Sequence, residues 1–448
     1  MKVWFLVALL SVALMVTVYC GNEADKGGDD DDSGDDDVSD VPVPEGCTGN
    51  ESVDAGKDAL IEHDLDQANF QFGCAWAEDK SNSAAAAWYA TTMAAMLSEN
   101  QVLSDLADDA GGSGSTNLWD FTYSFSWLPD LGETEPGALP GGTPQSTEII
   151  DAAVSEVLPV AQSMKTLFGV ALKDEDFQDT VPAQVTDASF MHPDDMKDYE
   201  VDTADLYLGR FVANALIGAL KALKAWNLQF DLANLVNGFD SDCPYDSIQA
   251  FLDDYPDFFE LLDQSLVAES KQYAQAALED YRSLLIAIQS ETDPQNNDLF
   301  TLDSSDVPRA LDENQKALDS LNGPVEVTLA SVDYEYPHHT FSGLMYAGAF
   351  FEDPWGRGTL PPLVADSFFN CYPDVDLSQS ENLSMNGVFP DWSADELIQL
   401  YRWMMNSWFG FWWWNADDWY DDDTVYDDDT WYDDDTVYDD DTYRGDPT

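Results

Sequence analysis

The sequence predicts an all-α fold, in which a short helical hairpin precedes a larger helical body and disordered acidic tails lie at both ends. Apolar residues recur at helical spacing along several segments between residues 50 and 405. The chain has 448 residues, of which 44 % are hydrophobic, so a sizeable core is available. Asp-rich stretches precede and follow this region, and segments so rich in charge bury too little apolar surface to fold.

Acidic residues dominate the whole chain and not only its ends. The sequence has 88 Asp and Glu against 17 Lys and Arg, and its formal net charge is −71. Residues 21–46 have a net charge of −10, residues 415–448 have −14, and Lys2 adds +1. The remaining residues, which form the body, therefore have a net charge of −48. Such a surface repels nucleic-acid phosphates and anionic lipid headgroups, and it attracts basic partners. We therefore expect a protein or peptide partner of basic character, no nucleic-acid binding, and a saline habitat in which salt screens the self-repulsion.

The N-terminus has the pattern of a secretory signal peptide over residues 1–19. Lys2 provides a short basic start, and residues 3–19 form an apolar run without charge. A membrane-spanning helix is the alternative, since about 18 apolar residues can cross a bilayer. The run ends at Cys20, however, and the polar, Asp-rich residues 20–46 are expected to form an acidic tether.

This arrangement resembles a bacterial lipoprotein precursor, in which the cysteine behind the apolar run is diacylated and becomes the new N-terminus. The resemblance implies a lipid on Cys20 and attachment of the exported protein to a membrane. Tyr19 departs from the family pattern, which has a small residue before the cysteine. Gly21 stands where Asp would favour the inner membrane, so the resemblance implies an outer membrane lipoprotein that faces the periplasm or the cell surface.

Four cysteines remain if Cys20 is acylated. An even number of cysteines in an exported chain indicates disulfides, and four cysteines allow three pairings. No two of them have the C-x-x-C spacing of a zinc or redox site. We expect two disulfides among Cys47, Cys74, Cys243 and Cys371, and we favour Cys47 with Cys74 because this bond would link the first helices to the chain that enters them.

Residues 47–107 contain small and large side chains at regular packing positions. The series is Gly56, Ala59, Leu65, Ala68, Phe72, Ala75 and, 34 positions after the first, Ala90. Small residues let two antiparallel helices approach closely while an aromatic ring fills the space beside them. The series resembles a tetratricopeptide repeat, although Lys80 stands where that repeat usually has Pro. A plain αα-hairpin on a larger helical body is the alternative.

Residues 108–146 are predicted to form a loop-rich aromatic insertion. Glycines lie at both ends of it, and aromatic residues alternate with other residues between Trp119 and Trp127. Such alternation is typical of a short strand or of an exposed aromatic face, and we expect these rings to pack in a core.

The region 147–415 has the pattern of a larger helical body. Apolar residues at helical spacing predict helices over residues 148–172, 203–226 and 265–290. Pro159 is expected to kink or divide the first of them, because proline lacks the N–H that a helix interior needs.

Shorter elements are expected toward the end of this body. Pro308 begins a predicted helix that ends at Gly323. Alternation over residues 325–329 indicates a strand, and Ser393 with Glu396 forms the capping box of a predicted last helix.

The order of these parts resembles a group of lipoproteins from myxobacteria and related deltaproteobacteria. Those proteins join a tetratricopeptide-like segment to a long helical body and end near a motif similar to Gly-Val-Phe-Pro-Asp at residues 387–391. The resemblance covers residues 48–405 and implies a fold and a location but no activity.

Two clusters of potential ligands could form metal sites. Residues 333–339 bring His and carboxylates together, but adjacent side chains of an extended segment point in opposite directions and do not easily meet at one ion. Asp240, Asp242 and Asp246 lack the glycine spacing of a calcium-binding EF-hand loop.

Catalytic signals are weak throughout the sequence. No Ser or Cys lies in a recognisable nucleophile elbow, and no glycine-rich phosphate loop follows a predicted strand. We therefore predict no catalytic residue and no cofactor, with an unrecognised hydrolase as the least favoured alternative.

Residues 416–448 form a tail in which a Tyr-Asp-Asp-Asp-Thr unit recurs every six residues. A disordered, solubilising tail is the simplest interpretation. The alternative is weak calcium binding by the Asp triplets, since calcium prefers oxygen ligands. The triplets are Asp421, Asp422, Asp423, Asp427, Asp428, Asp429, Asp433, Asp434, Asp435, Asp439, Asp440 and Asp441.

These observations favour a non-catalytic, lipid-anchored extracytoplasmic binding or scaffolding protein that binds a protein or peptide in grooves between its helices. An acidic cell-surface or matrix protein that binds divalent cations through its C-terminal repeats is the alternative.

Overall fold

The computed structural model describes residues 39–97, 100–103, 145–185, 198–230, 253–291, 306–330, 340–356, 363–364, 374–375, 383–394 and 396–397. The chain divides into two compact units, one formed by residues 1–328 and 342–394 and the other by residues 329–341 and 395–448. The described residues are mainly helical, as the sequence predicts, with three small sheets of two strands each.

Three helices come first among the described residues of the first unit, and a polar side chain caps the start of each one. They are α2 (Val53–Ile61), α3 (Leu65–Glu78) and α4 (Ser83–Met96). The caps are Ser52, Asp64 and Asn82, and each accepts a hydrogen bond from a backbone N–H of the first turn. The turns between the helices are therefore defined by local chemistry.

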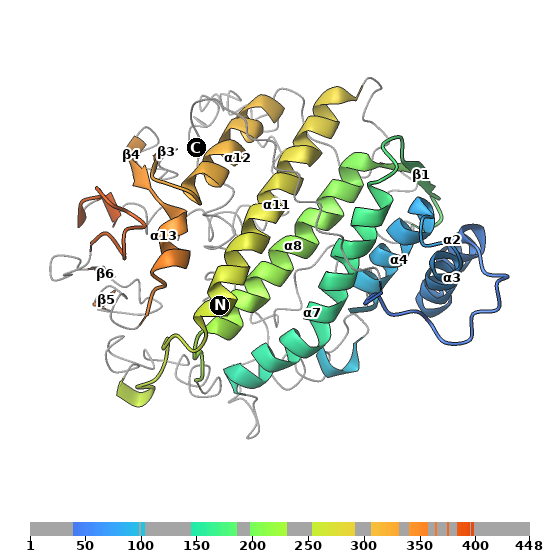
Figure 1. Cartoon of the computed structure of the whole chain (residues 1–448), viewed down its shortest axis with the longest axis horizontal. Helices are drawn as coiled ribbons and strands as arrows, with labels where there is room; N and C mark the ends of the chain where they lie inside the picture. Colours follow the sequence, from blue (N-terminus) through green and yellow to red (C-terminus); the bar gives the residue numbers. More distant parts are fainter. Residues whose placement is uncertain are drawn as a thin grey trace, which may run out of the picture. The chain divides into compact units, whose positions relative to one another are not determined.

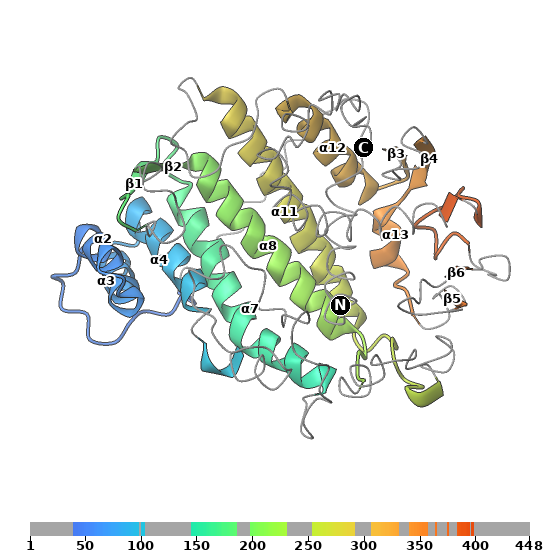
Figure 2. The ribbon, with the colours of Figure 1, turned by 180° about the vertical axis from the view of Figure 1, so that it is seen from behind.

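In the described part of the chain four more helices follow, the first three of them longer, and each packs on the next (Figures 1 and 2). They are α7 (Ser146–Ala171), α8 (Thr203–Ala225), α11 (Gln264–Ser290) and α12 (Val307–Ser320). Because α4 also packs on α7, the helices form one row in the order of the sequence. α7, α8 and α11 lie where the apolar spacing predicts them, and α12 lies where Pro308 and Gly323 predict a helix.

Two details of the long helices differ from a simple sequence interpretation. Pro159 lies inside α7 without dividing it, so of the two effects expected of this proline, a kink or a division, the division is wrong. α8 is long and apolar enough to cross a membrane by length and composition. In this structure α8 lies between α7 and α11, and its residues Ala213, Ile217 and Leu220 are buried there.

The strands are short. β1 (Gln178–Val181) pairs antiparallel with β2 (Tyr199–Asp202), and β5 (Leu363–Val364) pairs with β6 (Asp374–Val375). β3 (Val325–Ala330) confirms the predicted strand and pairs with β4 (Thr340–Met345). A short helix, α13 (Ala347–Glu352), follows β4. β1, β2 and α13 were not predicted because elements of four to six residues are too short to show a clear period.

The apolar core of the first unit consists of separate clusters. One lies under α2, α3 and α4 and extends to α7 and the β1–β2 hairpin. A second surrounds Trp226 at the end of α8, where Phe259 and Phe350 stack on the indole. A third joins α8, α11 and α12. The first cluster supports the candidate site.

Candidate functional site

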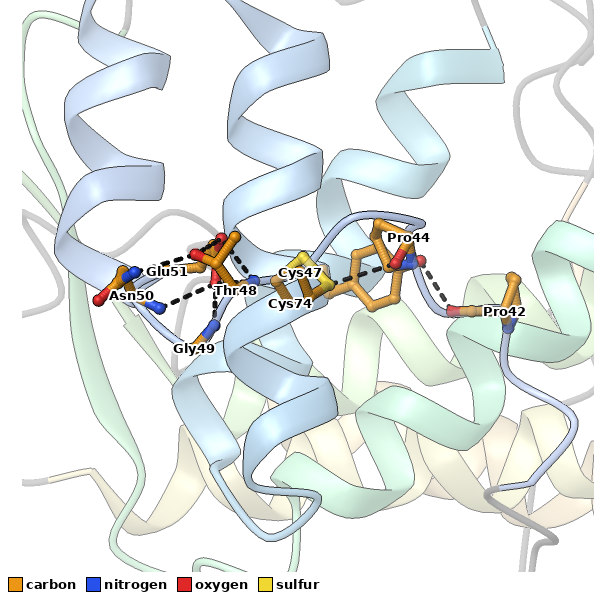
Figure 3. Close-up of a disulfide and its surroundings, with 9 residues drawn as sticks. Pro42, Pro44, Cys47, Thr48, Gly49, Asn50, Glu51 and Cys74 are labelled. Carbon is orange, nitrogen blue, oxygen red and sulfur yellow. Dashed lines mark hydrogen bonds between the residues drawn. A yellow bond between two sulfur atoms is a disulfide. The ribbon is translucent and has the colours of Figure 1, made fainter.

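A disulfide closes the N-terminal end of the helical row. Cys47 and Cys74 are bonded across 27 residues, with Cα atoms 5.4 Å apart, and this pairing confirms the one favoured from the sequence (Figure 3). Cys74 lies on α3 and is buried, whereas Cys47 lies in an exposed turn. The bond therefore attaches the incoming chain to the middle of a core helix.

The segment before this bond, residues 39–47, is the entry strap, and it packs on α3 and α4. Val41 is only 4 % exposed and belongs to the first core cluster. Tyr89 donates a hydrogen bond of 2.9 Å from its hydroxyl to the carbonyl of Pro42. Pro44 lies so close to Gly73 that a Cβ on that glycine would come within 2.6 Å of the proline ring.

The segment after Cys47, residues 48–51, is organised by the carboxylate of Glu51. It accepts hydrogen bonds from the backbone N–H groups of Thr48, Gly49 and Asn50 at 2.8–3.1 Å and from the Thr48 hydroxyl at 2.9 Å (Figure 3). Burial alone would raise the pKa of Glu51, but these hydrogen bonds outweigh it and lower the pKa to about 2. Glu51 is therefore ionised at any physiological pH.

A cleft of about 280 Å³ lies beside this loop and is called the acidic cleft below. Its lining comprises Glu51, Ser52, Val53, Asp54, Ala75, Glu78, Asp79 and Asn82. Four of these eight residues are acidic, and none of the described lining residues is basic.

Some polar residues of the acidic cleft already form hydrogen bonds within the protein, and others do not. Asp79 accepts hydrogen bonds from the hydroxyl and backbone N–H of Ser81, which lower its pKa. Ser52 and Asn82 cap α2 and α4. Within the described part of the chain, Asp54 and Glu78 form no hydrogen bond or ion pair. Their carboxylates are therefore available to a ligand.

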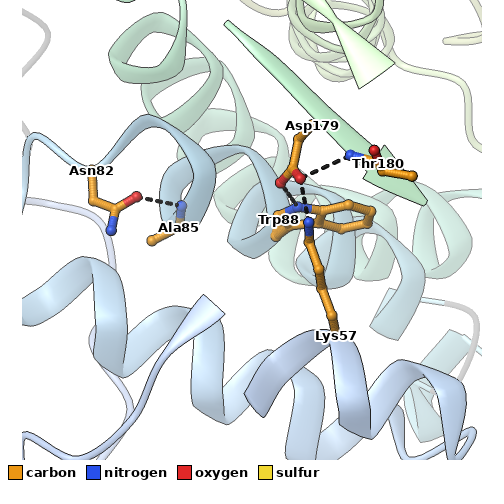
Figure 4. A network of polar contacts seen from close by, with 6 residues as sticks. All are labelled: Lys57, Asn82, Ala85, Trp88, Asp179 and Thr180. Atoms are coloured by element: carbon orange, nitrogen blue, oxygen red, sulfur yellow. Dashed lines mark hydrogen bonds and ion pairs between the residues drawn. The ribbon is translucent and has the colours of Figure 1, made fainter. Parts of the chain in front are cut away.

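A polar contact between three elements holds the wall of this site in place (Figure 4). Lys57 on α2 forms an ion pair with Asp179 on β1, and Trp88 on α4 donates a hydrogen bond of 2.7 Å to the same carboxylate. The Lys57 ammonium also lies 5.4 Å from the centroid of the Trp88 ring. Lys57 and Asp179 are only 18 % and 17 % exposed, so water screens the pair weakly. Sequence analysis missed this contact because the two residues are 122 positions apart.

Other basic side chains are also engaged where helices meet. Arg210 on α8 binds the buried Asp280 on α11, with 2.8 Å between Nε and the carboxylate. Lys221 pairs with Glu269, Lys224 with Asp151, and Lys271 with Glu352. These described basic side chains thus pair with carboxylates where elements meet, whereas none of the ion pairs found among the described residues involves a carboxylate of the acidic cleft.

The predicted packing positions lie in the first core cluster. Gly56 faces the ring of Phe72, and a Cβ on Gly56 would lie 2.4 Å from that ring. Ala68 and Ala90 are completely buried, as is Phe72. Ala59 and Ala75 are nearly so, and Leu65 packs at the edge of the cluster.

The motif at residues 387–391 has a structural role. Met385, Asn386 and Gly387 have φ values of 48°, 58° and 89°, so they form a left-handed turn. The indole N–H of Trp355 donates to the carbonyl of Met385 at 2.8 Å. The carboxylate of Asp391 accepts a hydrogen bond of 2.8 Å from the backbone N–H of Leu344. The left-handed turn thereby contacts Trp355 of the aromatic cluster, and Asp391 of the motif contacts the end of β4.

Several predicted sites lie outside the described residues. They are the lipidation site Cys20, the cysteines Cys243 and Cys371, the two potential metal clusters and the Asp triplets of the tail, so these stay predictions. Among the residues that the structure does describe, no three His, Cys, Asp or Glu side chains are grouped so that they could hold a metal ion.

A second cleft, of about 760 Å³, lies at the end of α12. It is lined by Asp319, Asn322, Gly323, Pro324, Val325, Glu326 and Thr328. It has two carboxylates instead of four, and no disulfide braces its described lining. The acidic cleft is therefore the stronger candidate.

No protein-family model, curated protein or solved structure matches this chain. The resemblance to deltaproteobacterial lipoproteins accordingly stays a prediction.

Proposed function

We propose that this protein is a non-catalytic, extracytoplasmic binding or scaffolding protein, anchored to the outer membrane through a lipid on Cys20. In this proposal it holds a basic segment of a partner protein in the acidic cleft. The observation that supports it best is the meeting of four carboxyl groups in one cleft whose described lining contains no basic side chain.

The chemistry of the cleft favours a Lys or Arg side chain as the ligand. Asp54 and Glu78 can accept charge-assisted hydrogen bonds, which are stronger than those between neutral groups. Glu51 and Asp79 are held by their own donors and add negative potential from fixed positions. A volume of about 280 Å³ can accept the end and part of the stem of such a side chain.

We also propose that α2, α3 and α4 form a tetratricopeptide-like unit. The close approach of Gly56 and Phe72 supports this proposal, because it is the contact that the small-and-aromatic spacing requires. The packing of α2 on α3 and of α3 on α4 is in keeping with it.

Binding of a short basic peptide to the full-length protein tests the proposed function. Asp54→Asn with Glu78→Gln is expected to weaken binding at least about tenfold, because two charge-assisted hydrogen bonds are lost. The matched control is Asp319→Asn with Glu326→Gln, which removes the same charge from the second cleft. At about 0.15 M salt this control should change the affinity less than about threefold, since distant charges are screened.

Isothermal titration calorimetry provides the affinities, and an acidic peptide of equal length shows the contribution of charge sign. Equal weakening by both double variants would mean that the peptide responds to the diffuse field of the surface, and the proposal of a defined site would be wrong.

A further inference from the structure

The entry strap occupies its groove in the manner of a bound peptide. Val41 and Pro44 are three residues apart; Val41 belongs to the first core cluster, and Pro44 lies against Gly73 on α3. Pro42 and Val43, which lie between them, are exposed, Val43 to 46 %. A polyproline II helix has three residues per turn, so its residues i and i+3 share one face. Over residues 41–44 the strap matches that period, since Val41 is buried, Pro44 is half-buried and the two residues between them are exposed.

The groove supplies the contacts that such a segment needs. Gly73 on α3 leaves room for the ring of Pro44, and the edge of Tyr89 lies beside it. The Tyr89 hydroxyl donates to the carbonyl of Pro42, in the stretch between the buried Val41 and the half-buried Pro44. Burial raises the pKa of Tyr89 to about 12, so the hydroxyl keeps the proton that it donates.

These contacts combine two elements of proline-rich peptide recognition, an aromatic side wall and a donor directed at a backbone carbonyl. We propose that the groove between α3 and α4 is a second binding site, for an extended segment of another protein with an apolar residue three positions before a proline. The entry strap is then an internal competitor that occupies the site when no partner is present.

The disulfide permits this exchange without unfolding. Cys47 follows the contact residues 41–44, so the strap can leave the groove while its C-terminal end stays bonded to α3. A tethered competitor has an effective concentration in the millimolar range or above, and it raises the partner concentration needed for binding. The groove is distinct from the acidic cleft, and the inference does not depend on the basic ligand proposed for that cleft.

The test uses the full chain and the synthetic peptide Ser-Asp-Val-Pro-Val-Pro-Glu-Gly, which copies residues 39–46. Val41→Ser with Pro44→Ser empties the groove and keeps the disulfide. Saturation-transfer NMR should detect the peptide on this variant with a dissociation constant on the order of 1 mM or tighter. Binding should be at least about fivefold stronger than to the native chain, because the internal competitor is gone. A peptide with the same two serines should not bind.

Two further changes in the emptied variant locate the peptide. Tyr89→Phe keeps the ring and should weaken binding about three- to tenfold, the effect of losing one hydrogen bond. Gly73→Ala places a methyl group where the proline lies and should abolish binding. The inference is wrong if the emptied variant keeps its helical circular dichroism and its disulfide but does not bind the peptide. It is equally wrong if Tyr89→Phe leaves the affinity unchanged. It is also wrong if the native chain forms dimers in which each protomer's strap occupies its partner's groove and the peptide only separates these dimers, which analytical ultracentrifugation would show.

Discussion

Gly56 shows how a single missing side chain supports the fold around the site. The Phe72 ring lies where a Cβ of residue 56 would be, at 2.4 Å. Gly56→Ala should therefore lower the free energy of unfolding by about 1–3 kcal/mol, the usual cost of overpacking a core. Gly323→Ala is the matched control, because nothing lies within 4 Å of its Cβ position. Urea denaturation measures both, and equal effects would show that the contact with Phe72 is not tight.

Asp280 is the most buried charged group between α8 and α11. It accepts hydrogen bonds from Arg210 at 2.8 Å and from the Asn214 amide at 2.8 Å. Burial raises the pKa of Asp280 despite the opposing effect of Arg210. A raised pKa means that this group favours folding most at low pH, and that its contribution declines as pH rises from the ordinary value of 3.8 through the folded one.

Two replacements of Asp280 distinguish the contribution of its charge to stability from that of its hydrogen bonds. Asp280→Ala should cost about 3 kcal/mol of unfolding free energy, because it leaves Arg210 and Asn214 without their acceptor. Asp280→Asn should cost less, since it keeps an acceptor oxygen. Chemical denaturation at neutral pH compares the two variants. A loss below about 0.5 kcal/mol in both would mean that the pair contributes nothing to the contact between α8 and α11.

Glu51 has the opposite dependence on pH. Its pKa falls from 4.5 to about 2 on folding, so its stabilisation is complete above pH 4.5 and is lost as pH falls toward 2. Glu51→Gln should therefore flatten the decline in stability within this window. A series of thermal melts between pH 5 and 2 tests it, and an unchanged slope would contradict the role of the loop at residues 48–51.

At the scale of elements, the long helices could be predicted because each one contains several turns of apolar spacing. α8 and α11 begin and end within one residue of the predicted limits. The disulfide between Cys47 and Cys74 could also be predicted, since both cysteines border the first helices. The acidic cleft could not be predicted, because it depends on how the end of α3 meets the start of α2. The position of the entry strap could not be predicted either, because the apolar-proline pattern of residues 41–44 does not indicate which surface this segment contacts.

The unbroken course of α7 through Pro159 leads to another prediction. Pro159 is exposed and has no N–H for the carbonyl of Ser155 one turn earlier. Pro159→Ala should raise the free energy of unfolding by about 1–3 kcal/mol, because the helix gains a hydrogen bond and loses little packing. Differential scanning calorimetry measures the change. A lower melting temperature would show that Pro159 stabilises the protein, because its fixed φ angle reduces the conformational entropy of the unfolded chain.

At the scale of the whole molecule, charge is distributed unequally between the interior and the surface. The described basic side chains largely pair within the protein, as Arg210, Lys221 and Lys271 do. With a formal net charge of −71, most carboxylates therefore have no basic partner. Like charges at this density repel one another and favour expansion of the chain. The same excess attracts a cationic ligand, so the proposed binding and the loss of stability expected at low salt have one cause.

Salt should accordingly stabilise this protein. The Debye length falls from about 30 Å at 0.01 M salt to about 3 Å at 1 M, so repulsion between surface carboxylates is progressively screened. We expect the urea midpoint of unfolding to rise steadily over this range of sodium chloride.

A chain without residues 415–448 is the control, because it lacks only −14 of the net charge. It should keep most of the salt dependence if the repulsion arises on the folded body. A midpoint that is flat or falls with salt would show that self-repulsion does not limit the stability of the fold. Loss of the effect in the shortened chain would instead assign it to the tail.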